Sequence, residues 1–331
     1  MSQRPIHADK GRDPVPSHDQ QNNKLLPGEH LFQAPNGLSF RYLVCSSSAN
    51  GQCVNPLVLV QGPGWGLGFQ YLQAGLSPLE DMFTLVYFQP RGSSGSSRPS
   101  DPGKMSCFDM ASDLDLFRSY LGMAKFPRMV GHSHGGTIVV AYAEMFPHCV
   151  EKILLIDHRL YGYTDLEFFR SARRNRINDP RYQQAYQVYD SVVPTDDASL
   201  TSFFIDILPL YFFDPEKYLP GFLEQLSLDP NLSNQNPNSQ TAIDFWCYSH
   251  VKRCDLELDV HERMIRSLGS VVAETMIIFG KDDAQCSVAI SGETCQRIPH
   301  AESIVLPDCG HFPWVESCDE TLSTMRTFLR R

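Results

Sequence analysis

Two parts of the chain alternate short apolar runs with amphipathic stretches. The runs at 56–61 (PLVLVQ), 83–89 (FTLVYFQ) and 151–157 (EKILLID) are apolar at most positions, which is typical of strands buried on both faces. Between such runs, residues 107–123 have apolar side chains at helical spacing. This alternation predicts an α/β fold with a mostly parallel central sheet.

The pattern also predicts how this α/β unit begins and ends. Residues 30–45 contain PNG between two β-rich runs, which indicates a hairpin. Near the end of the chain, the apolar runs at 275–280 and 302–306 predict two more strands. A final amphipathic stretch, DETLSTMRTFLRR, predicts a terminal helix.

Two segments depart from this pattern. Residues 1–27 are polar and without periodicity, which predicts a disordered tail. Residues 159–267 lack the strand–helix alternation, read as helices and loops, and hold about half of the chain's aromatic residues. We predict that they form a helical cap inserted into a core of residues 28–158 and 268–331. The aromatic side chains of this cap either line a pocket or form a second core.

Composition narrows the classes of function. The chain has 331 residues and a formal net charge of −10, which argues against binding to nucleic acid or to an anionic membrane. It has no apolar run of the ~18–20 residues that a membrane span needs and no apolar leader near its start. Its ten cysteines form no CxxC pair and are expected to be reduced. We therefore expect a cytoplasmic protein.

The strongest chemical signal is VGHSHGG, residues 130–136. Gly131, Ser133 and Gly135 fit the G-x-S-x-G pattern, with β-type residues before it and a helical stretch after it. A sharp strand-to-helix turn of this kind exposes the serine Oγ at the edge of a sheet. We predict that Ser133 is a nucleophile, and a structural serine is the alternative.

Ser133 has a histidine on each side. On a sharp turn the side chains of His132 and His134 project away from Oγ, so neither is expected to be its base. The backbone N–H of His134 is instead predicted to be an oxyanion donor. A His-x-His metal pair is an alternative, but no carboxylate or cysteine ligand pattern accompanies it. We expect neither a metal nor a cofactor.

The predicted base comes from the far end of the chain. His311 follows Gly310 just ahead of the terminal helix, and the order Ser…Asp…His along the chain suits this kind of serine turn. Its imidazole would take the Oγ proton and later return a proton to the leaving group.

A third residue must hold that imidazole in the right tautomer. Asp282 and Asp283 both follow the strand predicted at 275–280, and we favour Asp283. Asp282 remains an alternative. Asp157, at the end of a different predicted strand, is a weaker rival.

A second oxyanion donor is expected from the glycine-rich stretch 58–68 (VLVQGPGWGLG). Pro63 lacks an N–H, which leaves Gly62 as the best candidate, facing the carbonyl oxygen opposite the His134 amide. Trp65 in the same stretch either lines the acyl pocket or packs in the core.

Together these segments resemble the α/β-hydrolase superfamily and, within it, its proline iminopeptidase-like branch. The counterparts of four motifs of that branch are VQGPGWG (60–66), QPRGSSGSS (89–97), GHSHGG (131–136) and CGHFPW (309–314). An ungapped alignment places Gly62 on the branch's donor glycine. The resemblance implies an α/β-hydrolase core with an inserted helical lid (cap) and serine chemistry without a cofactor.

The chain also departs from that branch. Val60 stands where the branch has histidine, and Gln89 and Pro90 replace its Asp-Gln. No counterpart is found for the cap carboxylates that bind a substrate's free amino group in those peptidases. Residues 168–179 instead carry four arginines that form either a solvated helix face or a surface that steers an anionic substrate: Arg170, Arg173, Arg174 and Arg176.

The leading functional prediction is a serine hydrolase that acts through an acyl-enzyme. Its substrate would be an ester, lactone, thioester or N-terminal amide of a bulky, largely apolar small molecule or short peptide. One alternative keeps the same triad for acyl transfer, lactonisation, cyclisation or C–C cleavage. A second is a non-catalytic ligand-binding hydrolase shell. The oligomeric state stays open.

Overall fold

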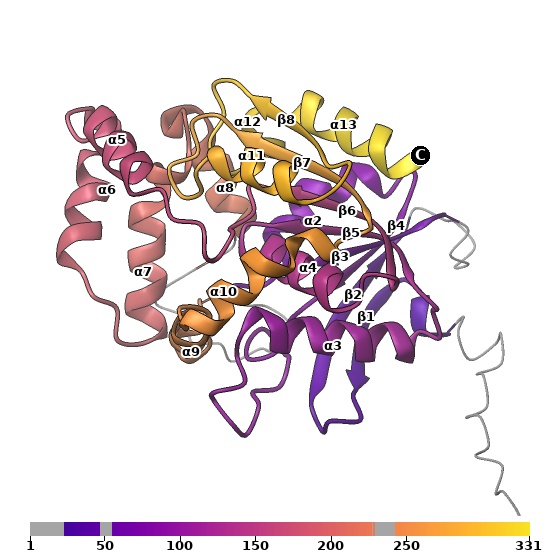
Figure 1. Cartoon of the computed structure of the whole chain (residues 1–331). Coiled ribbons are helices and arrows are strands. Elements are labelled where there is room, and N and C mark those ends of the chain that lie inside the picture. Colours follow the sequence, from indigo (N-terminus) through magenta and orange to yellow (C-terminus); the bar gives the residue numbers. More distant parts are fainter. Residues whose placement is uncertain (1–22, 47–54, 227, 229–241) are drawn as a thin grey trace, which may run out of the picture.

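The computed structural model describes residues 23–46, 55–226, 228 and 242–331, and its strands there form one eight-stranded sheet (Figure 1). The strand order is β1-β2-β4-β3-β5-β6-β7-β8. β1 and β2 pair antiparallel, as do β2 and β4, and all other pairs are parallel. The strands are β1 (Gly28–Gln33), β2 (Ser39–Cys45), β3 (Leu57–Gln61), β4 (Thr84–Phe88), β5 (Phe126–His132), β6 (Val150–Ile156), β7 (Glu274–Gly280) and β8 (Glu302–Leu306).

The central strands separate two hydrophobic cores. β3 is buried at every position, and successive side chains of a strand point to opposite faces of the sheet. Leu59 therefore joins the core on one face, whereas Val58 and Val60 join the core on the other. Burial on both faces explains why these strands read as continuous apolar runs.

Helices cover both faces of this sheet. α4 is almost wholly buried and packs against α3 and against β5 and β6, while α13 covers the opposite face with its apolar side. The helices and short 3-10 turns of the core are η1 (Asn23–Leu25), α2 (Gln70–Leu76), η2 (Ser77–Leu79), α3 (Cys107–Tyr120), α4 (His134–Met145), η4 (Leu268–Ser270), α11 (Ala289–Arg297), α12 (Pro313–Glu316) and α13 (Cys318–Arg330).

A run of helices, here called the helical insertion, separates β6 from β7. In Figure 1, α5, α6 and α7 lie together at the left, and the C-terminus lies on the opposite side. Part of the helical insertion has a small core of its own around Tyr182, Tyr186 and Leu210. Its elements are α5 (Leu166–Arg176), α6 (Pro180–Ser191), α7 (Asp197–Ile207), η3 (Leu208–Tyr211), α8 (Pro215–Leu226), α9 (Phe245–Asp255) and α10 (Leu258–Ser267).

The predicted α/β architecture is confirmed, and each predicted strand lies within one or two residues of an observed one. The division into a core and a cap at residues 159 and 267 stays a prediction. Of the predicted tail, residues 1–22 lie outside the described residues. No described helix is both long and apolar enough to cross a membrane, and the cysteines in the described part of the chain are free thiols.

Candidate active site

Ser133 occupies the sharp turn between β5 and α4. Its backbone has φ 52° and ψ −122°, a conformation that costs a non-glycine residue energy and is maintained by the surrounding structure. The Ser133 N–H donates to the Ile156 carbonyl at 2.9 Å, which ties the turn to β6. A Cβ on Gly131 would lie 2.5 Å from the Gly135 carbonyl oxygen, so the turn requires glycine there. The sequence pattern and the local geometry therefore agree.

The ring of His132 is fully engaged beneath the turn. Its Nε2 donates to the His311 carbonyl at 2.8 Å, which leaves Nδ1 to accept from the Tyr71 hydroxyl at 3.0 Å. Burial and the nearby His311 lower the pKa of His132 well below its usual value. A neutral ring with both nitrogens occupied cannot take a proton from Ser133 without breaking one of these bonds.

The ring of His134 is engaged on the other side. Its Nδ1 accepts from the Gly64 N–H at 3.1 Å, and its Nε2 donates to Asp255 Oδ2 at 2.6 Å. The other carboxylate oxygen of Asp255 accepts from the Cys107 N–H at 2.7 Å. His134 thus connects the glycine-rich loop after β3 to α9 of the helical insertion. Its own backbone N–H, in the first turn of α4, donates to no described residue, as is usual for a helix start.

His311 is oriented by Asp283. The His311 Nδ1 donates to Asp283 Oδ2 at 2.7 Å, and both side chains are buried. The other oxygen, Asp283 Oδ1, accepts from the backbone N–H groups of Gln285 at 2.7 Å and Cys286 at 3.2 Å. This arrangement fixes the tautomer, so that the His311 Nε2 carries the lone pair. That Nε2 makes no hydrogen bond to any residue that the structure describes.

The helical insertion holds the His311 loop in place. The His311 N–H donates to the Tyr211 carbonyl at 2.7 Å. Glu316 accepts from the Gly310 N–H at 2.6 Å and from the Phe213 N–H at 3.0 Å, and burial raises its pKa. The position of the imidazole therefore depends on contacts from both the core and the insertion.

The two rival aspartates lie in different surroundings. Asp157 follows β6, and its Oδ1 accepts from the Gly280 N–H at 2.8 Å. Burial and the adjacent Asp283 carboxylate raise the pKa of Asp157 well above its usual value, which favours a neutral carboxyl. Asp282 is held through its backbone, whose N–H donates to the Cys309 carbonyl at 2.8 Å. Of the three aspartates, Asp283 is the one hydrogen-bonded to His311.

Two groups of side chains near Ser133 have metal-ligand spacing, with their ligand atoms within 4.8 Å of one another. They are His132, Asp157 and His311, and Asp283, Cys286 and His311. Both rings already make hydrogen bonds through nitrogen, and burial raises the pKa of the Cys286 thiol. A metal here would have to replace hydrogen bonds that orient His311.

Ser133 and His311 line the same cavity, whose volume is about 490 Å³. The Ser133 Oγ and the His311 Nε2 are not hydrogen-bonded, and such catalytic bonds are often long until a substrate binds. Side chains of the helical insertion form much of the apolar wall, among them Tyr189, Leu200, Phe203, Phe204, Ile207, Tyr211, Phe222 and Tyr248. The wall of the cavity is therefore formed partly by the helical insertion and partly by the turn of the sheet core that carries Ser133.

The prediction that Gly62 is an oxyanion donor is wrong. The Gly62 N–H donates to the Phe88 carbonyl at 2.9 Å, because the β3–β4 ladder continues one residue beyond the strand. Pro63 has no N–H, and the Gly64 N–H donates to His134. The next amide in the loop is that of Trp65, which donates to no described residue. The Trp65 side chain lines the cavity.

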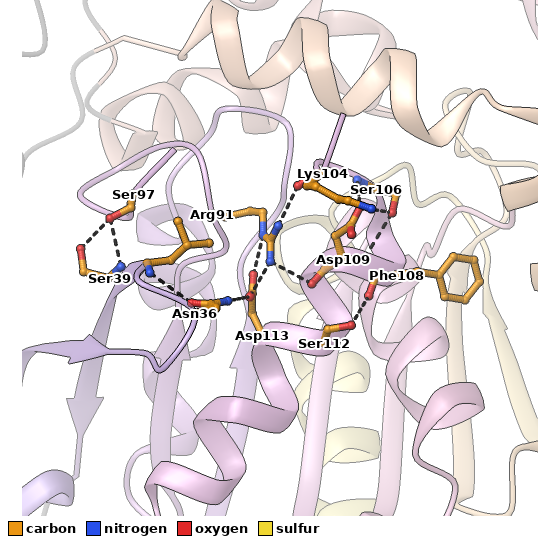
Figure 2. A network of polar contacts seen from close by, with 11 residues as sticks. Asn36, Ser39, Arg91, Ser97, Lys104, Ser106, Phe108, Asp109, Ser112 and Asp113 are labelled. Atoms are coloured by element: carbon orange, nitrogen blue, oxygen red, sulfur yellow. Dashed lines mark hydrogen bonds and ion pairs between the residues drawn. The ribbon is translucent and has the colours of Figure 1, made fainter. Parts of the chain in front are cut away.

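A buried polar network holds the neighbouring turn after β4 (Figure 2). Arg91 donates to both carboxylate oxygens of Asp113 on α3, each at 2.6 Å, and both side chains are buried. Gln89, two residues earlier, accepts from the Phe69 N–H at 3.1 Å and donates to the Leu67 carbonyl at 3.3 Å. Segment 89–97, one of the four motif counterparts, therefore anchors the end of the glycine-rich loop to α3.

Among the cavity residues that were missed at the level of sequence is Arg159. Arg159 lies two residues beyond Asp157, past the carboxyl end of β6, where ligands commonly bind in parallel sheets. That position is the signal that could have identified it. The four arginines of 168–179 do not line the cavity. Three of them have partners elsewhere: Arg173 with Asp190, Arg174 with Glu167, and Arg176 with the Leu210 and Asp282 carbonyls.

Known proteins resemble this chain over most of its length. The family model described as alpha/beta hydrolase fold matches residues 55–317. A probable proline iminopeptidase from Leptolyngbya boryana is 22% identical over 82% of this chain and 84% of its own length. A proline iminopeptidase from Pestalotiopsis fici, PfmaB, is 24% identical over 91% of this chain and 99% of its own.

A solved structure shares the fold. An alpha/beta fold family hydrolase from Bacillus anthracis str. Sterne superposes with a TM-score of 0.66 at 18% identity, covering 92% of this chain and 99% of its own. The family model and the two relatives confirm the resemblance seen in the sequence motifs. The chain belongs to the α/β-hydrolase family, as a divergent, proline iminopeptidase-like hydrolase.

Proposed function

We propose that the protein is a serine hydrolase in which Ser133 attacks the acyl carbon of its substrate. The His311 Nε2 accepts the Oγ proton and then donates a proton to the leaving group. Asp283 keeps the imidazole in the required tautomer and stabilises the charge that develops on it. Water activated by the same histidine then releases the acyl group from Ser133.

The oxyanion of the tetrahedral intermediate is held by two backbone amides. The first is that of His134, at the start of α4, where unpaired N–H groups and the helix dipole favour negative charge. The second is that of Trp65, since the N–H groups of Gly62 and Gly64, earlier in the same loop, already donate to other groups. Both residues line the cavity that contains Ser133.

One observation carries the proposal. Of the three histidines around Ser133, His311 alone pairs one ring nitrogen with a buried carboxylate and leaves the other without a hydrogen bond to a described residue. The strained backbone of Ser133 supports it, because such strain is concentrated at functional sites.

The cavity wall favours a substrate with a sizeable apolar part. Aromatic and aliphatic side chains dominate the lining, and about 490 Å³ is enough for a small molecule or a short peptide. Esters, lactones, thioesters and amides all present the acyl carbon that this chemistry requires. The proposed reaction uses no cofactor.

A panel of p-nitrophenyl esters of increasing acyl length tests the proposal, with Ser133→Ala as the matched variant. We expect release of p-nitrophenolate by the native protein and a loss of at least ~10⁴-fold in kcat/KM in the variant. Reaction in oxygen-18 water should place the label in the acid product. Equal activity of the Ser133→Ala protein would refute the proposal, and an unlabelled product would point to transfer or cyclisation.

A further inference from the structure

The cavity has an unusual charge balance for this acidic chain. The chain has 38 Asp and Glu residues against 28 Lys and Arg residues. Among the described residues that line the cavity, however, there is no Asp or Glu, and there are two cations, Arg159 and Lys252. The described side chains of the wall therefore offer positive charge and no negative charge to a ligand in direct contact with them.

Arg159 is fixed beside the nucleophile by its backbone. Its N–H donates to the Ser133 carbonyl at 3.3 Å, and its own carbonyl accepts from the Thr137 hydroxyl at 2.7 Å. The turn that carries Ser133 thus also positions Arg159. Since Arg159 and Ser133 line the same cavity, a group bound by this side chain would share a site with the acyl carbon.

The guanidinium of Arg159 is held by aromatic rings and has no carboxylate partner. Its central carbon lies 5.6 Å from the ring centre of Trp65 and 5.5 Å from that of Tyr161. Such cation–π contacts use the charge of the group but none of its five N–H donors. Within the described residues, no salt bridge or hydrogen bond engages those donors.

Two other arginines of the protein differ from Arg159 in being paired with carboxylates. Arg91 is buried against Asp113, and Arg98 is paired with Asp244. Arg159 is an only partly exposed residue of the cavity wall, so its guanidinium donors are available to a ligand that enters the cavity. Lys252 lies at the exposed edge of the same cavity, with its Nζ 3.4 Å from the Tyr248 hydroxyl. It adds a second positive charge on the approach to Arg159.

We propose that Arg159 forms an anion subsite next to Ser133 and that the substrate's acyl part carries a carboxylate. The inference rests on the proposed function and specifies its substrate class. A planar carboxylate matches the forked donors of arginine. It also argues against a substrate with a free amino group, because an ammonium would face Arg159 and Lys252 with no described carboxylate in the wall.

Paired substrates test this subsite. Mono-p-nitrophenyl esters of straight-chain dicarboxylic acids with five to eight carbons would be compared with the matching methyl p-nitrophenyl diesters, which lack the charge. At the best chain length, we expect the native protein to prefer the acid by at least tenfold in kcat/KM. Arg159→Gln should remove that preference by slowing the acid at least tenfold and changing the diester less than about threefold.

Two further variants serve as controls. Arg159→Lys should keep part of the preference for the acid, because lysine keeps the positive charge but lacks the paired N–H donors of the guanidinium. Arg173→Gln should keep all of it, because Arg173 is paired with Asp190 outside the cavity. A native protein that cleaves both substrates equally, or an Arg159→Gln protein that loses both activities alike, would overturn the subsite.

The same assay separates this inference from the proposed function. Ser133-dependent cleavage of the diester without any preference for the acid would refute the anion subsite alone. Cleavage of neither substrate, together with no fluorophosphonate label on Ser133, would refute the serine hydrolase and the subsite with it. A preference for the acid that disappears in Arg159→Gln supports both.

Discussion

Two buried histidine–aspartate pairs flank Ser133, and they differ in one hydrogen bond. The distance from His311 Nδ1 to Asp283 Oδ2 is 2.7 Å, and that from His134 Nε2 to Asp255 Oδ2 is 2.6 Å. In the first pair, the remaining ring nitrogen has no partner among the described residues. In the second, it accepts the Gly64 N–H. A nearby carboxylate is therefore common to both histidines, and the state of the second ring nitrogen is what distinguishes His311 from His134.

The two pairs also connect different parts of the fold. Asp283 and His311 follow the neighbouring strands β7 and β8, whose carboxyl ends lie side by side. His134 begins α4, whereas Asp255 ends α9 in the helical insertion. We infer that in the first pair His311 transfers protons while Asp283 orients it, and that the second pair fixes the loop of Gly64 against the insertion.

The largest contrast is expected between the two aspartates near His311. Asp283→Asn should lower kcat by about 10⁴-fold, because an amide no longer selects the tautomer with its lone pair on Nε2. Asp157→Asn should lower kcat by less than about tenfold, because a neutral carboxyl and an amide are similar in this buried position. Steady-state kinetics on one ester would measure both.

Circular dichroism would show that both variants are folded. Should Asp157→Asn prove as damaging as Asp283→Asn while remaining folded, the acid of the triad would have to be reassigned or shared between the two carboxyl groups.

A smaller effect is expected at the second pair. His134→Gln and Asp255→Asn should each lower kcat by roughly 10- to 100-fold, because the loop that carries the Trp65 amide loses a support and misplacement of about 1 Å has effects of this size. Ser133 should still react with a fluorophosphonate. A loss as large as that of Asp283→Asn would mean that His134 takes part in proton transfer.

The smallest effect is expected on stability, at Glu144. Unlike Asp283 and Asp255, this buried carboxyl makes no hydrogen bond to a histidine. Burial raises the pKa of Glu144 on α4 to about 9, and neither carboxylate oxygen has a described hydrogen-bond partner. The folded state therefore holds a proton that the unfolded state releases above its ordinary pKa of 4.5. Between these two values, the free energy of unfolding should fall as pH rises.

Glu144→Gln removes this titration. Its melting temperature should exceed that of the native protein at pH 8 by roughly 2–4 °C or more, and the difference should shrink towards pH 5. Calorimetric melting at the two pH values would measure this. An equal difference at both would show that Glu144 does not titrate on unfolding in this range.

Local patterns were sufficient for much of the fold and for part of the site. The buried strands and the turn at Ser133 could be predicted because each depends on a few consecutive residues: apolar runs in the strands and glycines at the turn. Chain order also pointed to Asp283 and His311, which the structure brings into contact.

Other features depend on contacts that no local pattern reveals. The Gly62 N–H is already hydrogen-bonded to the Phe88 carbonyl, because the β3–β4 ladder reaches that far. The sequence does not show where a ladder ends. The contact of His134 with Asp255 joins residues 121 positions apart. Arg159 belongs to no motif, and its significance comes from the cavity and from the absence of a described hydrogen-bond or ion-pair partner for its side chain.

The most direct test is the rate at which a fluorophosphonate labels Ser133 in two histidine variants, followed by intact-protein mass. The account predicts that His311→Gln slows labelling by about 10⁴-fold or more, since it removes the base. It predicts that His134→Gln slows labelling by no more than about 100-fold. Labelling of His311→Gln at the native rate, or a greater loss in His134→Gln, would contradict the assignment of His311 as the base.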